Sequence, residues 1–276
     1  MFAAGLVTFR EGLEAALIVG IVISYLSKMG HQTQLRFAWV GVILAMIVSA
    51  LAAFGLQWVG TSLEEPYEQI FEGSMMFLAV GVLTWMIFWM RYQGRFMKRD
   101  LEHQVETALA SGAAFGVFGL TFLAVFREGI ETALFLSVSA FASDAGATLI
   151  GSVIGLALAM AVGYAIYVMA MRLNIRLFFD VTSILLLVFA AGLFAHGIHE
   201  FQEIGWLPML TQSAWNTEGV LSNGSFVGSI LRALVGYNAT PSVLEVIAYI
   251  FYWGVVLVAI RYWTQHLSAR LAPTHA

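Results

Sequence analysis

The chain has 276 residues, of which 60% are hydrophobic and only 11% are charged, and its formal net charge is -4. So apolar a composition excludes an ordinary soluble domain and indicates an integral membrane protein of the all-α class. The absence of cysteine excludes disulfide bonds, thiolate metal sites and cysteine nucleophiles. The basic residues form short separate clusters rather than one patch, which argues against binding to nucleic acid.

Seven stretches are long and apolar enough to be membrane-spanning helices, because a span needs about 20 mostly apolar residues. Their approximate limits are 3–27, 36–59, 70–91, 113–142, 147–171, 178–199 and 242–263. The first stretch lacks a basic n-region and is interrupted by charges, so we expect a retained helix and not a cleaved signal peptide. The outer segment, 200–240, contains a short amphipathic stretch over 226–235 that we expect to cap the outer mouth.

The basic residues between the spans predict the orientation of the chain. Ten of the 13 fall in loops on one side, namely Lys28, Arg36, Arg91, Arg95, Lys98, Arg99, Arg172, Arg176, Arg261 and Arg270. The positive-inside rule therefore places the N-terminus outside and the C-terminus in the cytoplasm. The first and fourth spans then enter from opposite sides. Spans 1–3 (about 1–95) and 4–6 (about 113–200) are thus predicted to be inverted repeats, followed by the seventh span in a single transmembrane domain.

The first and fourth spans carry the same charged motif, Arg-Glu-Gly-x-Glu, at 10–14 and 127–131. On a helix, its three charged side chains project from one face. Each charge in the middle of a span costs roughly 2.5–3.5 kcal/mol, so pairing of Arg10 with Glu14 and of Arg127 with Glu131 must offset part of this cost. Four carboxylates and two guanidiniums leave a formal charge of two negatives, which a cation or protons must balance.

We interpret these carboxylates as the ligands of a metal ion, because hard multivalent cations take oxygen ligands. The predicted ligands are Glu11, Glu14, Glu128 and Glu131, with Arg10 and Arg127 in support. The small residues that follow, Gly12 with Ala16 and Gly129 with Ala133, are expected to let two helix backbones approach closely and so to bring the carboxylates within coordination range. The alternative is that each motif is a buried salt bridge that only holds the helices together.

Two further groups of polar residues are predicted at the outer face. In the acidic loop over 63–72, Glu65 and Glu68 are read as an entry vestibule and Glu72 as a relay ligand, against the alternative of an ordinary acidic loop. Glu64, Glu68 and Glu72 would stack one turn apart if this loop were helical. After the sixth span, His196, His199, Glu200 and Glu203 share one helical stripe with metal-ligand spacing, against the alternative of a polar helix end. Ser242 and Glu245 predict a capping box at the start of the seventh span.

The paired motifs, on the first and fourth of seven predicted spans, resemble those of the oxidase-dependent iron transporter family, which includes bacterial EfeU-type permeases and fungal high-affinity iron permeases. The resemblance covers essentially the whole chain. It implies iron as the transported substrate, no cofactor and no enzymatic activity, with import from the periplasm across the bacterial inner membrane. It implies the motif glutamates as iron ligands. The partners it implies are a periplasmic iron-binding component and a haem peroxidase or other oxidase, and assembly into a homo-oligomer is left open.

Two other functions stay open beside iron import. The first is transport of another hard or borderline metal, such as manganese or lead, because the ligand set does not discriminate among them. The second is a membrane-embedded iron oxidoreductase that uses the histidine and glutamate stripe, although di-iron bundles carry Glu-x-x-His on core helices. The methionines Met75, Met76, Met86, Met90 and Met97 are interpreted as core or lipid contacts and not as soft-metal ligands.

Overall fold

The computed structural model describes the chain except for residues 94–96, 111–112, 144, 169–174 and 272–276. The described residues form helices, with one isolated bridge between Ser213 and Ser242. The helices are α1 (Phe2–Lys28), α2 (Gln32–Ser62), α3 (Tyr67–Gln93), α4 (Met97–Ala110), α5 (Ala113–Ala142), α6 (Ala145–Val168), α7 (Ile175–Glu203), α8 (Phe226–Val235) and α9 (Val243–Leu271). Each of the seven predicted spans therefore corresponds to a helix, although residues 169–171 of the fifth span lie outside the described residues, and the predicted amphipathic stretch is α8.

Five of the helices in the described part of the chain are long and apolar enough to cross a membrane: α2, α3, α6, α7 and α9. The helices α1 and α5 are as long, with 27 and 30 residues, but each carries the three charges of a motif. Large apolar side chains such as Phe54 of α2 and Val258 of α9 are about 70% exposed, at 71% and 69%. The protein is thus a helical membrane protein, whereas seven crossings and the orientation stay predictions.

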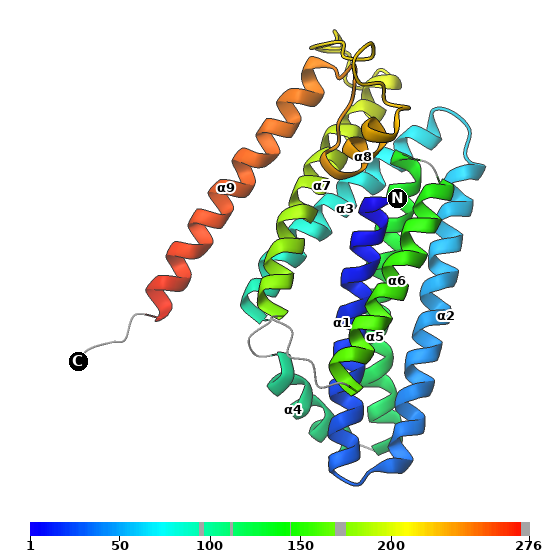
Figure 1. Cartoon of the computed structure of the whole chain (residues 1–276), viewed down its shortest axis with the longest axis vertical. Coiled ribbons are helices and arrows are strands. Elements are labelled where there is room, and N and C mark those ends of the chain that lie inside the picture. Colours follow the sequence, from blue (N-terminus) through cyan, green and yellow to red (C-terminus); the bar gives the residue numbers. More distant parts are fainter. Residues whose placement is uncertain (94–96, 111–112, 144, 169–174, 272–276) are drawn as a thin grey trace.

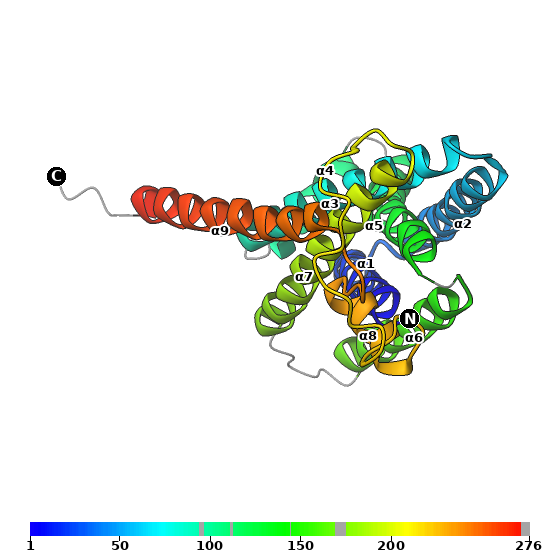
Figure 2. The same cartoon turned by 90° about the horizontal axis from the view of Figure 1, so that it is seen from above.

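The helices pair along their lengths, with α1 beside α6 and α5 beside α2 (Figures 1 and 2). Small residues allow these approaches. A Cβ added at Gly155 of α6 would collide with the backbone of Gly5 in α1, and one at Gly41 of α2 would lie 2.7 Å from the carbonyl oxygen of Phe118 in α5. Close backbone contact at small residues is a common way of joining helices in lipid.

The motif glycines also pack closely, but not against each other's helices. A Cβ at Gly12 would lie 2.9 Å from the Cβ of Ala159 in α6, and one at Gly129 would overlap the side chain of Ser49 in α2. Our expectation that these residues draw the carboxylates together is corrected accordingly. Neighbouring residues of an α-helix point about 100° apart, so the glycines face α6 and α2 while the glutamates face the interior between α1 and α5.

The largest hydrophobic core lies where α3 and α7 pack together and against α1 and α5. Met75, Met76, Met86 and Met90 of α3 are buried in it, as predicted for core methionines. At the lower end of the bundle in Figure 1, α4 closes a smaller core against α1 and α5, in which Val105 of α4 is fully buried. The hydroxyl of Tyr25 hydrogen-bonds Glu106 at the same end.

The upper end of the bundle in Figure 1, which we call the N-terminal end, holds Met1, α8 and the start of α9. The predicted capping box of α9 is confirmed: the backbone N–H of Glu245 donates to Ser242 Oγ at 3.1 Å, and that of Ser242 donates to Glu245 Oε1 at 3.0 Å. From this cap, α9 packs mainly on α7 and then extends away from the other helices (Figure 2).

Candidate metal site

The motif of α1 is completely enclosed. The exposed fractions of Arg10, Glu11 and Glu14 are 0%, 1% and 1%. Arg10 Nε lies 3.1 Å from Glu14 Oε1, and Arg10 Nη1 lies 3.8 Å from Glu11 Oε1. The remaining nitrogen of the Arg10 guanidinium, Nη2, donates to the sulfur of Met90 in α3 at 2.8 Å. The first predicted arginine-to-glutamate pair is therefore present, one helical turn apart.

The motif of α5 repeats this pairing in a more open setting. Arg127 Nε donates to Glu131 Oε1 at 3.2 Å and lies 3.6 Å from Glu128 Oε1. The side chain of Arg127 is 41% exposed, whereas those of Glu128 and Glu131 are 4% and 13% exposed. The guanidinium of Arg127 also lies over the indole ring of Trp89 in α3, 4.3 Å from the ring centroid. Each motif thus contains the same arginine-to-glutamate pair, but the two motifs differ in their exposure to solvent.

Carboxylates from both motifs converge between α1 and α5. One oxygen each of Glu11, Glu128 and Glu131 lies within 4.8 Å of the others, which is the one such group of three or more potential ligands in the described residues. We call these three residues the carboxylate triad. Glu14 is paired with Arg10 and is not in the triad, but it is close enough to Glu128 to repel it electrostatically.

The triad has oxygens that no protein donor satisfies. Both oxygens of Glu11, Oε2 of Glu128 and Oε2 of Glu131 are buried without a hydrogen-bond partner. Leaving a buried polar atom unpaired costs about 1–3 kcal/mol, and more when the group is charged. Because an oxygen-only set of carboxylates is what hard cations prefer, the triad is suited to hold such an ion within the helix bundle.

The acidic loop is only partly helical. Glu64 and Glu65 precede α3, so the predicted stacking of Glu64, Glu68 and Glu72 is wrong for Glu64. Glu68 and Glu72 do lie one turn apart on α3, and Glu72 is within electrostatic reach of Glu200 and Glu203 on α7. The vestibule role of Glu65 and Glu68 and the relay role of Glu72 stay predictions.

The predicted stripe on α7 forms as expected. His196 Nε2 lies 3.5 Å from Glu200 Oε1, and His199 Nε2 lies 3.1 Å from Glu203 Oε1. His199 Nδ1 also lies 3.1 Å from Oε1 of Glu245, which joins the capping box of α9 to the stripe. Within the described residues, the stripe does not bring three ligand atoms within 4.8 Å of one another. Metal binding by His199, Glu200 and Glu203 therefore stays a prediction.

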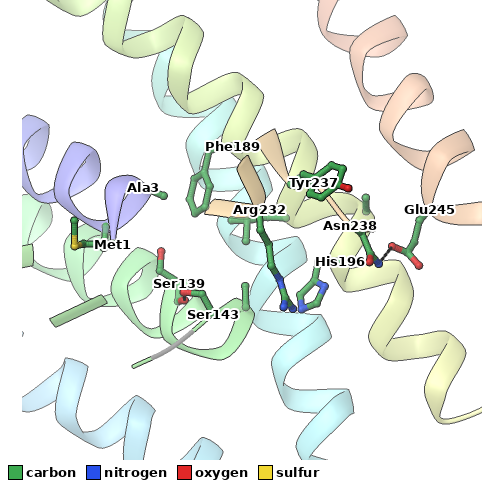
Figure 3. Close-up of a pocket in the computed structure, with 16 residues that line it drawn as sticks. Met1, Ala3, Ser139, Ser143, Phe189, His196, Arg232, Tyr237, Asn238 and Glu245 are labelled. Carbon is green, nitrogen blue, oxygen red and sulfur yellow. Dashed lines mark hydrogen bonds between the residues drawn. The ribbon is translucent and has the colours of Figure 1, made fainter. Parts of the chain in front are cut away.

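Near the N-terminal end, a pocket lies between the ends of α1 and α5, α7 and the segment from α8 to α9 (Figure 3). Arg232 and His196 point towards each other in it. Ser139 of α5 also lines the pocket, and its buried hydroxyl has no hydrogen-bond partner. Ser139 is two turns beyond Glu131 on α5, about 12 Å along the helix, so the pocket lies between the N-terminal surface and the triad.

Two residues that contact the site were not predicted. Met90 was interpreted only as a core or lipid contact, and the place of Trp89 near a span end is typical of an interfacial ring, but the two side chains contact Arg10 and Arg127. Both lie far from the motifs in sequence, and no spacing or composition signal connects them. Only the packing of α3 against the motif helices brings them there.

These features define a class of protein: a multi-pass helical membrane protein with a charged, oxygen-rich group enclosed among its helices. Residues 1–272 match the model of the iron permease FTR1 family, to which the chain belongs. Its relatives include the ferrous iron permease EfeU of Escherichia coli O6:H1, 37% identical over 262 residues, covering 94% of this chain and 95% of the relative. EfeU of Yersinia pestis is 37% identical over 255 residues, covering 91% and 90%. No solved structure matches the chain significantly.

Proposed function

We propose that the protein imports iron across the bacterial inner membrane, from the periplasm to the cytoplasm, through the carboxylate triad. The observation that carries the proposal is the convergence of Glu11, Glu128 and Glu131, with four buried oxygens that have no protein donor. Membership of an iron permease family supports iron as the ion, and relatives named ferrous iron permeases favour Fe(II). Glu14 neutralises Arg10, so that the charge of the triad stays available to the ion.

In the proposed architecture, α1–α3 and α5–α7 are inverted repeats and α9 is the seventh span, with the N-terminus in the periplasm. The pairing of helices supports this arrangement. Each motif helix packs along the second helix of the other half, α1 along α6 and α5 along α2, and α1 and α5 run in opposite directions (Figure 1). Transporters built from inverted repeats place their substrate near the bilayer midplane, where the two halves meet.

Iron would reach the triad from the N-terminal end. The acidic side chains at this end attract cations and are the proposed collection point, namely Glu68, Glu72, Glu200 and Glu203. A periplasmic iron-binding component and an oxidase would deliver iron to them. Relatives are named permeases, which favours transport over redox catalysis. The stripe on α7 also lacks three ligand atoms within 4.8 Å of one another in the described residues, so the oxidoreductase alternative has no specific support.

Uptake of radioactive iron by purified protein in liposomes tests the function. We expect uptake of Fe(II) above that of protein-free liposomes, with Mn²⁺ and Pb²⁺ competing weakly. Comparison of Fe(II) with Fe(III), with and without a pH gradient, identifies the transported form. Uptake of neither iron form above the protein-free background would overturn the proposal, and uptake of Mn²⁺ in preference to iron would reassign the substrate.

Changing Glu131 to aspartate should impair transport although the charge is unchanged. Shortening the side chain by one methylene moves its oxygens by about 1.5 Å, well beyond the roughly 0.2 Å tolerance of a metal site. We expect the Michaelis constant for iron to rise at least about 10-fold, since even indirect partners of a ligand affect metal affinity by 10–100-fold. The matched control is Glu106→Asp, on an exposed carboxylate of α4 outside the triad and outside the acidic groups at the N-terminal end. Wild-type kinetics in Glu131→Asp would contradict its role as a ligand.

A further inference from the structure

Two consecutive residues near the end of α3 contact the arginines of both motifs. The indole ring of Trp89 lies 4.3 Å from the guanidinium carbon of Arg127 on α5. The sulfur of Met90 accepts a hydrogen bond of 2.8 Å from Arg10 on α1. A single turn of α3 therefore holds both of the cations that neutralise the motif glutamates, although α3 contributes no charge to either pair.

The two arginines are held in different ways. Arg10 is 0% exposed and has two carboxylates and a sulfur as neighbours. A thioether is only a weak acceptor, so Met90 cannot replace Glu14 as the partner of a buried cation. Arg127 is 41% exposed and rests on tryptophan, the side chain that forms the strongest cation–π contacts. Arg127 therefore has a second favourable partner that Arg10 lacks.

This difference bears on the oxygens that an ion would need. Arg127 Nε occupies Oε1 of Glu131 and lies 3.6 Å from Oε1 of Glu128, and both glutamates belong to the triad. Arg10 is paired most closely with Glu14, which is outside the triad. A divalent ion bound by the free oxygens of Glu128 and Glu131 repels Arg127 and weakens its pairs with these carboxylates, whereas the pair of Arg10 with Glu14 can persist.

We propose that Trp89 is a positioning residue that retains Arg127 when bound iron weakens the pairs of this arginine with Glu128 and Glu131, so that the α5 half of the site adjusts while the α1 half stays fixed. The proposal rests on the proposed transport of iron through the triad. With iron bound, the ring is the main remaining partner of Arg127. Loss of the ring therefore raises the free energy of the iron-bound site more than that of the iron-free site, in which Glu131 also holds the arginine.

The test is the iron dependence of uptake by Trp89→Leu and Trp89→Phe in liposomes. Leucine removes the aromatic face, and we expect the Michaelis constant to rise about 2- to 30-fold, the range produced by cation–π energies, with the maximal rate within about twofold of wild type. Phenylalanine keeps a weaker aromatic face and should restore most of the affinity. Trp85→Leu is the matched control, because Trp85 lies one turn earlier on α3 and is 69% exposed; it should behave as wild type.

Equilibrium binding of radioactive Fe(II) to the purified variants provides a second measurement, and their melting temperatures show whether they are folded. Equal weakening by Trp89→Leu and Trp89→Phe, or a lower maximal rate with an unchanged Michaelis constant, would mean that Trp89 only fills space, and the proposal would be overturned. Unchanged iron binding in Trp89→Leu would overturn it as well. These outcomes leave iron transport by the wild type intact, whereas absence of uptake by the wild type counts against the proposed function itself.

Discussion

Replacing Glu11 by alanine should reduce iron uptake at least about 100-fold while the protein still folds and reaches the membrane. Glu11 is the member of the triad from α1, and neither of its buried oxygens has a hydrogen-bond donor. Its removal takes away a predicted ligand. Loss of a residue that only holds a ligand in place typically reduces metal affinity or activity by 10–100-fold, so loss of a ligand itself should have a larger effect. Uptake in liposomes at matched protein amounts measures the effect.

The same substitution should leave stability unchanged or raise it. The closest partner of Arg10 is Glu14 at 3.1 Å, and this pair survives the loss of Glu11, which lies 3.8 Å from the arginine. Removing an enclosed carboxylate also removes its desolvation cost. Glu64→Ala, at an exposed carboxylate before α3, is the control and should transport normally. Normal uptake in Glu11→Ala would exclude the triad as the ion site.

Replacing Arg10 by leucine should destabilise the protein by about 3–5 kcal/mol, the usual cost of removing one partner of a buried ion pair. Arg10 is 0% exposed and is the cation nearest both Glu11 and Glu14. Without it, two enclosed carboxylates lose their nearest positive charge. Thermal unfolding in detergent, followed by tryptophan fluorescence, measures the effect as a lower melting temperature.

Two matched variants separate charge from packing. Arg127→Leu should destabilise the protein less, because the Arg127 side chain is 41% exposed and water reaches its partners more easily. Adding Glu14→Gln to Arg10→Leu should recover part of the lost stability, because it removes one of the unpaired charges. Equal melting temperatures for Arg10→Leu and Arg127→Leu would show that the two motifs contribute equally and that the enclosure of Arg10 has no energetic consequence.

Much of the helical architecture can be predicted from the sequence because lipid leaves a chain few options. Backbone polar groups must be satisfied within a span, so each apolar stretch of sufficient length becomes a helix, and each of the seven predicted ranges corresponds to a helix in the described residues. Local signals were equally informative where they act within a few residues. The capping box at Ser242 and Glu245 and the α7 stripe follow from helical spacing alone.

Predictions that depended on distant packing were less successful. The motif glycines were expected to bring the carboxylates together, but Gly12 packs on α6 and Gly129 on α2. All four motif glutamates were predicted to be ligands. Glu14 lies beside Arg10, as its predicted pairing requires, while the other three converge, and its role as a ligand stays a prediction. In each case the sequence indicated what kind of contact the residue makes, but not which helix it contacts. Which helix faces a given side chain depends on the crossing angles and offsets between helices.

The sequence by itself determined that this is a helical membrane protein with two charged motifs whose negative charge exceeds their positive charge, since these properties follow from composition and from spacing along one helix. Only the tertiary structure decided which carboxylates meet, that Arg10 is enclosed while Arg127 is partly exposed, and that Trp89 and Met90 contact the two arginines. The physical reason is that a single helix fixes which side chains share a face, whereas contact between faces depends on how α1, α3 and α5 pack.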